Sequence, residues 1–368
     1  MTPYWILFIV AATGALTERA RKPATSGVHA KRTGLNSKGL NASWWLIALG
    51  LTLFIGLRHE VGGDWGSYLK SFESLDLPTL LDELPWSTLL SRDIGYRVFE
   101  WIGQATTNSI YAVNLLSGLV FAYGLARFCK DLPRPLLALT CAIPYLVIVV
   151  GMGYSRQAIA IGCAMVGLTW LGRGYRWRYA SWILLASLFH QSASVLLGLA
   201  LVVGKRRIVF AMISALGLVA LLAYAVAAET TARLASGYLA SEYESEGALI
   251  RLAMGSIPAL LFLLRQRHFA MHTFERSMWR WMALGQLTFL ALLAVSPSST
   301  AIDRIALYLL PLQLALFAHL PHAYARLIGK RVCALLIIAY YGAVLFTWLF
   351  FATHAGYWLP YETVLNTL

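Results

Sequence analysis

Four arginines interrupt or end apolar parts of the chain, and their chemistry would be the binding of an anion. Arg58 follows the run "SWWLIALGLTLFIGL", Arg156 lies in "YSRQA", Arg251 in "ALIRLAM" and Arg304 in "DRIALY". A guanidinium presents a planar fork of donors that matches phosphate oxygens, and it stays charged at any physiological pH. A single arginine at a membrane edge usually extends to lipid headgroups. Four that converge at one depth would instead predict a site for an anionic ligand.

Candidate proton acceptors accompany these arginines. His190, in "FHQSAS", is the first choice for a general base, and Asp64 and Asp303 are the next. Ionisable groups inside a membrane are expensive to bury, so they are functional candidates. Structural roles stay open, because His190 equally fits a hydrogen-bonded helix tip and Asp303 could pair with Arg304 or Arg156.

Glycines and aromatic side chains surround the same polar positions. Gly62 and Gly63 allow a tight turn that would direct Asp64 and Trp65 toward the apolar runs. An aromatic face such as that of Trp65 is suited to packing on a sugar ring. The other polar side chains expected at this level are Glu60, Tyr68, Asp93, Tyr154, Gln157, Gln191, Ser192 and Tyr308.

The composition is that of a polytopic membrane protein. Hydrophobic residues make up 59% of the 368 residues and charged residues 13%, and the mean hydropathy is +0.64. These values lie far outside the soluble globular range. Apolar runs occupy about 3–16, 43–57, 108–126, 135–153, 157–172, 179–190, 192–204, 208–228, 248–264, 279–295, 304–320 and 332–352. We therefore predict an all-α fold, a single transmembrane domain over 1–368 with about twelve membrane-embedded helices, some of them shorter than a full span.

Basic clusters recur at alternate connections between these runs. Placing them on the cytoplasmic side puts 22 of the 30 Lys and Arg there, but only 3 of the 17 acids. The positive-inside rule then predicts that both termini are periplasmic. In this orientation the four arginines lie at or just inside the periplasmic ends of spans. Arginines near the ends of spans are usually on the cytoplasmic side.

The segment "RYASWILLASLFHQSASVLLGLALVVGKRR" is basic at both ends. A hairpin of two short arms with "FHQSAS" at its tip would keep both ends cytoplasmic, with polar backbone tolerated where it lines a wet cavity. A single tilted helix over 179–204 is the competing interpretation.

Three connecting segments are long enough to name. Residues 58–108 form a large periplasmic loop in which "YLKSFESL", "PTLLDEL" and "DIGYRVFEWIGQA" predict short amphipathic helices. Residues 17–43 predict a flexible cytoplasmic loop rich in Gly, Ser, Thr and Lys. Residues 229–247 form an acidic, aromatic periplasmic loop that is expected to be solvated.

Several classes of function have no support in the sequence. There is no GxxxxGK[ST], no HExxH and no GxSxG in a suitable context. The absence of a DxD pair argues against a cytoplasmic nucleotide-sugar transferase. The four cysteines fall inside spans or on the cytoplasmic side, so neither a disulfide framework nor a thiol metal site is indicated. We expect no metal, no cofactor and no nucleic-acid partner.

The order of five short motifs resembles a known family. Arg58 with "VGGDWGSY", "DIGYRVF" at 93–99, "SRQAIAIG" at 155–162, "FHQSA" at 189–193 and "DRIALY" at 303–308 are similar to the EpsG branch of the Wzy-type polysaccharide polymerases. The family usually has Glu where this chain has Asp93. The resemblance covers roughly residues 45–320.

This resemblance implies a GT-C-class polymerase of the bacterial inner membrane with its active site facing the periplasm. It would join undecaprenyl-pyrophosphate-linked oligosaccharide repeats into an O-antigen, capsule or exopolysaccharide, alongside a chain-length regulator and a flippase. Arg58, Arg156, Arg304 and Arg251 would bind the pyrophosphate, with His190, Asp64 or Asp303 as the general base, which is helpful rather than obligatory. Sugar contact or positioning would fall to Trp65, Tyr68, Asp93, Tyr154, Gln157 and Tyr308.

Three rival functions remain at this point. An O-antigen ligase would use similar chemistry but transfer the glycan to a lipid A core. A transporter or flippase of an anionic lipid-linked sugar would also place arginines in an outward cavity, yet it should carry polar residues on the inner halves of its spans. A membrane acetyltransferase would need an arrangement of His and Asp for an acyl donor that the sequence lacks.

Overall fold

The computed structural model describes residues 1–19, 39–74, 93–203, 247–295 and 299–366. In these ranges the chain forms helices, and an isolated bridge between Arg58 and Thr363 is the β-type contact recorded there. The all-α prediction is therefore confirmed for the described chain. The run at 208–228, the motif "PTLLDEL" and most of the loops 17–43 and 229–247 lie outside the described residues.

Five described helical segments are long and apolar enough to cross a membrane, which makes this a membrane protein by length and composition. They are Ile110–Lys130, Pro135–Gly153, Ala248–His268, Ile302–Ala323 and Lys330–Phe351. Three shorter apolar helices are Thr2–Thr17, Ala42–Gly56 and Gln191–Val202. The sequence predicts about twelve membrane-embedded helices, and the described residues contain these five long and three shorter apolar ones. The three shorter helices lie on apolar runs that are too short for a full span.

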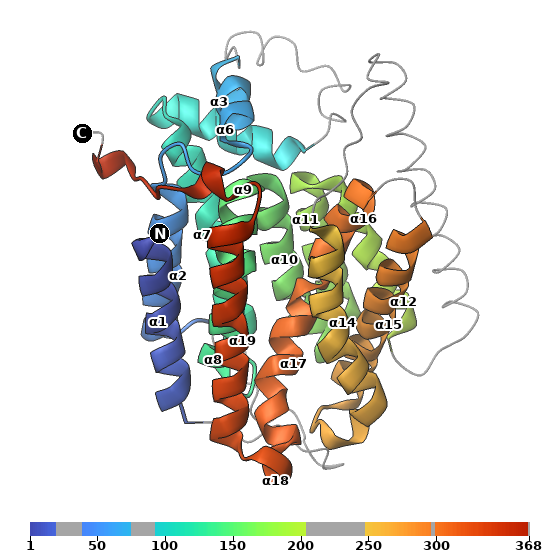
Figure 1. Cartoon of the computed structure of the whole chain (residues 1–368). Helices are drawn as coiled ribbons and strands as arrows, with labels where there is room; N and C mark the ends of the chain where they lie inside the picture. Colours follow the sequence, from blue (N-terminus) through green and yellow to red (C-terminus); the bar gives the residue numbers. More distant parts are fainter. Residues whose placement is uncertain (20–38, 75–92, 204–246, 296–298, 367–368) are drawn as a thin grey trace.

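The helices form an elongated bundle whose two ends differ (Figure 1). The central elements are α7 (Ile110–Lys130), α8 (Pro135–Ala142), the π-helix η1 (Ile143–Val150), α9 (Gly151–Gly153) and α10 (Ser155–Gly172). Around them stand α1 (Thr2–Thr17), α2 (Ala42–Gly56), α14 (Ala248–Arg265), α15 (Thr273–Val295), α17 (Leu310–Ala323) and α19 (Lys330–Phe351). The end that carries α3 (Trp65–Glu73) and α6 (Ile94–Thr106) is here named the upper end, and the opposite end the lower end.

Helices α7 and α10 cross so closely that glycine is required at their contact. A Cβ on Gly124 would lie 2.2 Å from the carbonyl oxygen of Gly162. Backbone atoms cannot yield in the way that a flexible side chain can. The pair thus fixes the position of α10, whose first residues carry much of the polar chemistry described below.

We expect Gly124→Ala to lower stability, because its methyl group would push α7 and α10 apart. Overpacking of this kind costs about 1–3 kcal/mol, measured as a fall in the apparent melting temperature in detergent. Gly50→Ala is the matched control, since a Cβ on Gly50 meets nothing within 4 Å. Equal melting temperatures for the two variants would show that the crossing is not tight.

The chain reverses at His190, as the hairpin interpretation requires. Helix α11 (Arg176–Phe189) ends there, and the 3₁₀ helix η2 (Gln191–Leu196) and α12 (Leu197–Val202) return beside it. The Tyr179 hydroxyl donates to the Leu196 carbonyl at 2.5 Å, and Arg176 donates to the Val203 carbonyl. These cross-links between the arms exclude a single long helix over 179–204.

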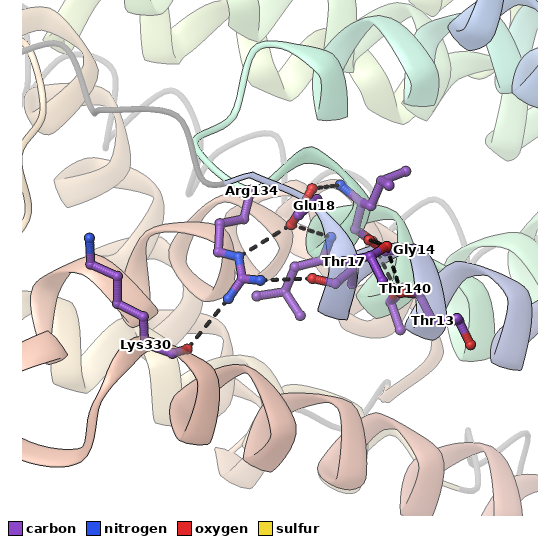
Figure 2. Close-up of polar contacts among 10 residues, drawn as sticks. Thr13, Gly14, Thr17, Glu18, Arg134, Thr140 and Lys330 are labelled. Carbon is purple, nitrogen blue, oxygen red and sulfur yellow. Dashed lines mark hydrogen bonds and ion pairs between the residues drawn. The ribbon is translucent and has the colours of Figure 1, made fainter.

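A buried ion pair ties three helices together at the lower end (Figure 2). Glu18 accepts from the backbone N–H of Leu136 at 2.8 Å and from Arg134 Nε at 3.3 Å. Arg134 also donates to the carbonyls of Ala15 at 2.7 Å and Lys330 at 3.4 Å. The end of α1 and the starts of α8 and α19 are thereby held in one place.

The upper end is covered by amphipathic helices and by the C-terminal segment. Tyr68 and Phe72 form the buried face of α3, and Tyr96, Glu100 and Gly103 that of α6, so both described helices of the predicted periplasmic loop have the expected character. The C-terminal segment packs back on this end through donation from Tyr4 to the Trp358 carbonyl at 2.7 Å and from Trp358 Nε1 to the Ile148 carbonyl at 2.9 Å. Both termini consequently lie at the upper end (Figure 1).

Candidate active site

The first three residues of α10 connect polar groups from three other parts of the chain. Ser155 accepts from Arg58 at 3.0 Å, Arg156 pairs with Asp93 at 2.9 Å, and Gln157 donates to the carbonyl of Arg304. Consecutive residues of a helix point in different directions. Three adjacent residues of α10 can therefore each contact a different segment of the chain. The upper end of α10 is therefore where the predicted site residues meet.

Arg58, which the sequence assigns to the pyrophosphate, is enclosed by protein groups in this structure. Its side chain is 1% exposed, and its guanidinium donates to the carbonyls of Ile55 at 2.6 Å and Val61 at 3.1 Å and to Asn114 at 3.2 Å. A guanidinium whose donors are directed at protein oxygens in this way is not presented to a ligand. Arg58 instead holds the upper end of α2 against α7 and α10.

Arg156 is positioned by a carboxylate and two aromatic rings. Asp93, in the left-handed region at φ 63°, precedes α6 and pairs with the guanidinium, whose carbon lies 5.3 Å from the ring centre of Tyr68 and 5.9 Å from that of Tyr96. Cation–π contacts of this kind stabilise a fixed arginine. The Arg156 side chain is still 43% exposed, so it is both held and open to a ligand.

Arg304 is an exposed cation on α16 (Ser299–Ala306). Its backbone is held by the buried amide of Gln157, so Gln157 positions an arginine, one of the two roles predicted for it. Burial raises the pKa of Asp64, while the positive charges of Arg304 and Arg156 act to lower it. Asp64 thus lies within electrostatic reach of both arginines.

Arg251 and Asp303 form a second ion pair at the same end. Two hydrogen bonds of 2.8 and 2.5 Å join them, and the Arg251 guanidinium lies 5.8 Å from the ring centre of Tyr145. The Tyr154 hydroxyl interacts electrostatically with Arg251, Asp64, Asp303 and Arg304. Asp303 pairs with Arg251, whereas the sequence suggested Arg304 or Arg156. Both carboxylate oxygens of Asp303 accept from Arg251.

His190 stands at the hairpin tip in a short hydrogen-bonded chain. Its Nδ1 lies 2.7 Å from Ser192 Oγ, and Ser192 donates to the Tyr308 hydroxyl at 3.3 Å. When Nδ1 of His190 is protonated and donates to Ser192 Oγ, Nε2 is unprotonated. Nε2 is then the ring nitrogen that can accept a proton from a substrate. Burial lowers the pKa of His190 to about 4, with Asp93 acting against this and Arg304 and Arg156 adding to it. The imidazole is accordingly neutral at pH 7, as a base must be.

Trp65, the first residue of α3, packs on protein groups just after a glycine turn. Gly62, at φ 113°, lies where a Cβ would meet the Met152 carbonyl at 2.5 Å, so the predicted glycine turn is present. The Trp65 ring centre is 5.7 Å from the guanidinium carbon of Arg58 and 6.1 Å from the ring of His59. Trp65 thus packs beside the Arg58 guanidinium while its side chain stays partly exposed.

Several contributors to the site were missed from the sequence. Asn114 and Ser155 bind Arg58, Tyr96 lies beside Arg156, and Tyr145 lies beside Arg251. Tyr96 lies inside the motif "DIGYRVF", so its position was a usable indication. Asn114 belongs to the apolar helix α7 and Tyr145 to the apolar π-helix η1, and no sequence signal next to either residue indicates its partner.

Glu100 is a buried carboxyl group close to this cluster. Its residue is 1% exposed, and burial raises its pKa. Among the residues that the structure describes, Glu100 Oε1 and the Tyr96 hydroxyl are buried atoms with no hydrogen-bond partner. The described part of the chain contains no group of three or more His, Cys, Asp or Glu side chains placed to hold a metal ion.

Comparison with known proteins gives one family match. No curated protein and no solved structure matches the chain significantly. The family model described as "EpsG family" matches residues 41–363, a range that contains every candidate site residue discussed above. The match extends over most of the 368 residues, and the protein therefore belongs to the EpsG family.

Proposed function

We propose that this protein is a glycosyltransferase that polymerises oligosaccharide repeat units carried on undecaprenyl pyrophosphate. The observation that carries the proposal is the meeting of Arg156, Arg304 and Arg251 with the neutral His190 at one end of a membrane bundle. Fixed cations suit a pyrophosphate, and a neutral imidazole suits a hydroxyl nucleophile. Membership of the EpsG family supports a polysaccharide polymerase.

In the proposed reaction, a sugar hydroxyl of one lipid-linked repeat attacks the anomeric carbon of the growing glycan. The new glycosidic C–O bond forms as the bond to the pyrophosphate breaks, and the electron pair of that bond leaves with undecaprenyl pyrophosphate. Negative charge grows on the leaving group, so preorganised arginines lower the barrier. The hydroxyl proton passes to Nε2 of His190.

The other predicted site residues take supporting roles in this scheme. Asp93 and Tyr68 hold Arg156, Gln157 holds Arg304, and Tyr308 orients His190 through Ser192. Tyr154 interacts electrostatically with Arg251 and Asp303, and Asp64 with Arg304 and Arg156, so we assign both to sugar contact. Asp64 is the second candidate for the base, because its carboxyl group is not committed to an arginine in the way that of Asp303 is.

The orientation of the bundle is also part of the proposal. The lower end carries Lys130 at the end of α7, Arg134 before α8 and Lys330 at the start of α19, so we assign it to the cytoplasm. The upper end then faces the periplasm of an inner membrane, as the GT-C arrangement requires. A flippase would supply the repeat units there, and a chain-length regulator would act on the product.

The direct test uses purified protein and a defined undecaprenyl-pyrophosphate oligosaccharide in detergent or nanodiscs. A ladder of products that differ by one repeat supports the proposal. Transfer only onto an added lipid A core would identify a ligase. Movement of the lipid across a bilayer without any new glycosidic bond would identify a transporter, and either result would refute polymerisation.

The pH dependence of the rate tests the role of His190. Because its pKa is lowered from 6.5 to about 4, the neutral base persists below pH 6 and is lost only as the pH falls toward about 4. We expect wild-type polymerisation to hold its rate at about pH 5.5, and His190→Gln to be slower by about 100-fold. Gln191→Ala, at an exposed position, is the control. A wild-type rate that fell with a midpoint near pH 6.5 would contradict this environment for His190.

A further inference from the structure

The C-terminal segment 357–364 is bonded to the turn that precedes α3. The backbone N–H of Gly62 donates to the Tyr357 carbonyl at 2.8 Å, and that of His59 donates to the Glu362 carbonyl at 2.9 Å. The segment crosses the upper end of the bundle, where α3 and α9 lie (Figure 1). The glycine turn is therefore held from outside by a part of the chain that is remote in sequence.

Trp358 lies where this segment, the glycine turn and the start of α10 meet. The residue is 3% exposed. A Cβ on Gly153 would lie 2.5 Å from Cζ2 of its indole, and a Cβ on Gly63 would lie 3.6 Å from Cη2 of the same ring. The indole thus packs against both glycines, and any side chain at Gly153 would displace it.

Three helices hold the Trp358 indole and backbone in place. Trp358 Nε1 donates to the carbonyl of Ile148 in η1 at 2.9 Å, and its own carbonyl accepts from Tyr4 of α1 at 2.7 Å. Its ring meets that of Trp348, in the last turn of α19, edge to face with the ring centres 5.2 Å apart. Because it is anchored to three elements, the indole is a fixed support for the two glycines.

Each of the two glycines leads directly into residues of the candidate site. Gly63 precedes Asp64, and Gly153 lies three residues before Arg156. The two sides also meet above the indole, since the Arg156 backbone N–H donates to the Tyr68 hydroxyl at 3.5 Å. Catalytic groups must be held within about 0.5 Å of the productive geometry. The spacing between the two glycines therefore bears on how Asp64 and Arg156 face a substrate.

We infer that Trp358 is a positioning residue of the active site. Its indole sets the spacing between the glycine turn and the start of α10, and through it the placement of Asp64 relative to Arg156. The inference rests on the proposed function for the reaction that these residues serve. It adds to that reaction a residue that lies outside the five sequence motifs.

The kinetic test compares Trp358→Leu with wild type over a range of repeat-unit concentrations. A shift of about 1 Å can cost about 100-fold in rate, so we expect kcat to fall at least about tenfold, with KM within about threefold of wild type. Trp177→Leu makes the same change at a residue that is 89% exposed, and it is the matched control. The control should keep kcat within about twofold.

A complementary pair of changes tests whether contact with Gly153 is the cause. Gly153→Ala puts a methyl group 2.5 Å from the indole and should lower kcat as Trp358→Leu does. Adding Trp358→Phe, whose smaller ring has no Cζ2, should restore part of that loss. A double variant whose loss is only the sum of the two single losses would exclude this contact, because residues that act through one contact are not additive.

Spin labels at Gly66→Cys on α3 and Gln191→Cys at the hairpin tip report the geometry without any reaction. Both positions are exposed, and the four native cysteines are buried, so labelling is selective. Electron paramagnetic resonance should show a broadened or shifted distance distribution in Trp358→Leu and an unchanged one in Trp177→Leu.

The outcomes separate this inference from the proposed function. An unchanged distance or an unchanged kcat in Trp358→Leu would overturn the inference even if wild type polymerises. A changed distance in a protein that makes no polymer would support Trp358 as the residue that places the turn, and would refute the polymerase. Gly153→Ala carries the same distance and rate measurements if Trp358→Leu fails to fold.

Discussion

Arg156→Ala is expected to lower the rate of polymerisation about 100- to 1,000-fold, the loss typical of removing one preorganised donor to a developing negative charge. Arg156 is the exposed cation that Asp93, Tyr68 and Tyr96 hold in place, so its charge is fixed before the leaving group departs. The measurement is the initial rate of product-ladder formation by equal amounts of folded protein.

Two variants make this prediction specific. Arg156→Lys should recover only part of the rate, because an ammonium keeps the charge but loses the planar fork of donors. Arg97→Ala removes an exposed arginine from the same region and should leave the rate within about twofold of wild type, since surface changes of this kind cost within about 0.5 kcal/mol. Equal rates for Arg156→Ala and Arg97→Ala would remove Arg156 from the site.

Arg58→Ala is expected to cost stability before it costs chemistry. The variant would leave the carbonyls of Ile55 and Val61 and the side chain of Asn114 without their donor in a buried space. Each unsatisfied buried group costs about 1–3 kcal/mol, so we expect a loss of about 3 kcal/mol or more. The readouts are the apparent melting temperature and the yield of monodisperse protein.

The contrast with Arg156→Ala decides between two roles for Arg58. Arg58→Lys should also be unstable, since one ammonium cannot reach acceptors spread around a guanidinium. Arg156→Ala should melt close to wild type, because that side chain is 43% exposed. An Arg58→Ala protein that folds normally but cannot polymerise would restore the sequence-based view that Arg58 contacts the pyrophosphate.

The level of the arginines could be predicted from the sequence, because the membrane fixes which residues share a depth. Charge asymmetry and run length place the ends of spans, and Arg156, Arg251 and Arg304 do meet at one end of the bundle. The hairpin at His190 followed from the same rule, since a single helix would have carried one basic end to the wrong side.

Which arginine is buried and which is open could not be predicted in this way. Arg58 is enclosed by Asn114 and Ser155, which are 56 and 97 residues away in the chain, and its neighbour in the isolated bridge is Thr363. Helix packing, not depth, brings these groups together. The pairing of Asp303 with Arg251 depends likewise on the contact of α14 with α16, about which the sequence pattern carries no information.

The most direct test of the central claim is to count released undecaprenyl pyrophosphate against glycosidic bonds formed by the purified protein. The account predicts one lipid pyrophosphate released for each repeat added by wild type, and a proportional loss of both in Arg156→Ala. Lipid pyrophosphate released without elongation, or elongation that Arg156→Ala and His190→Gln leave at the wild-type rate, would contradict it.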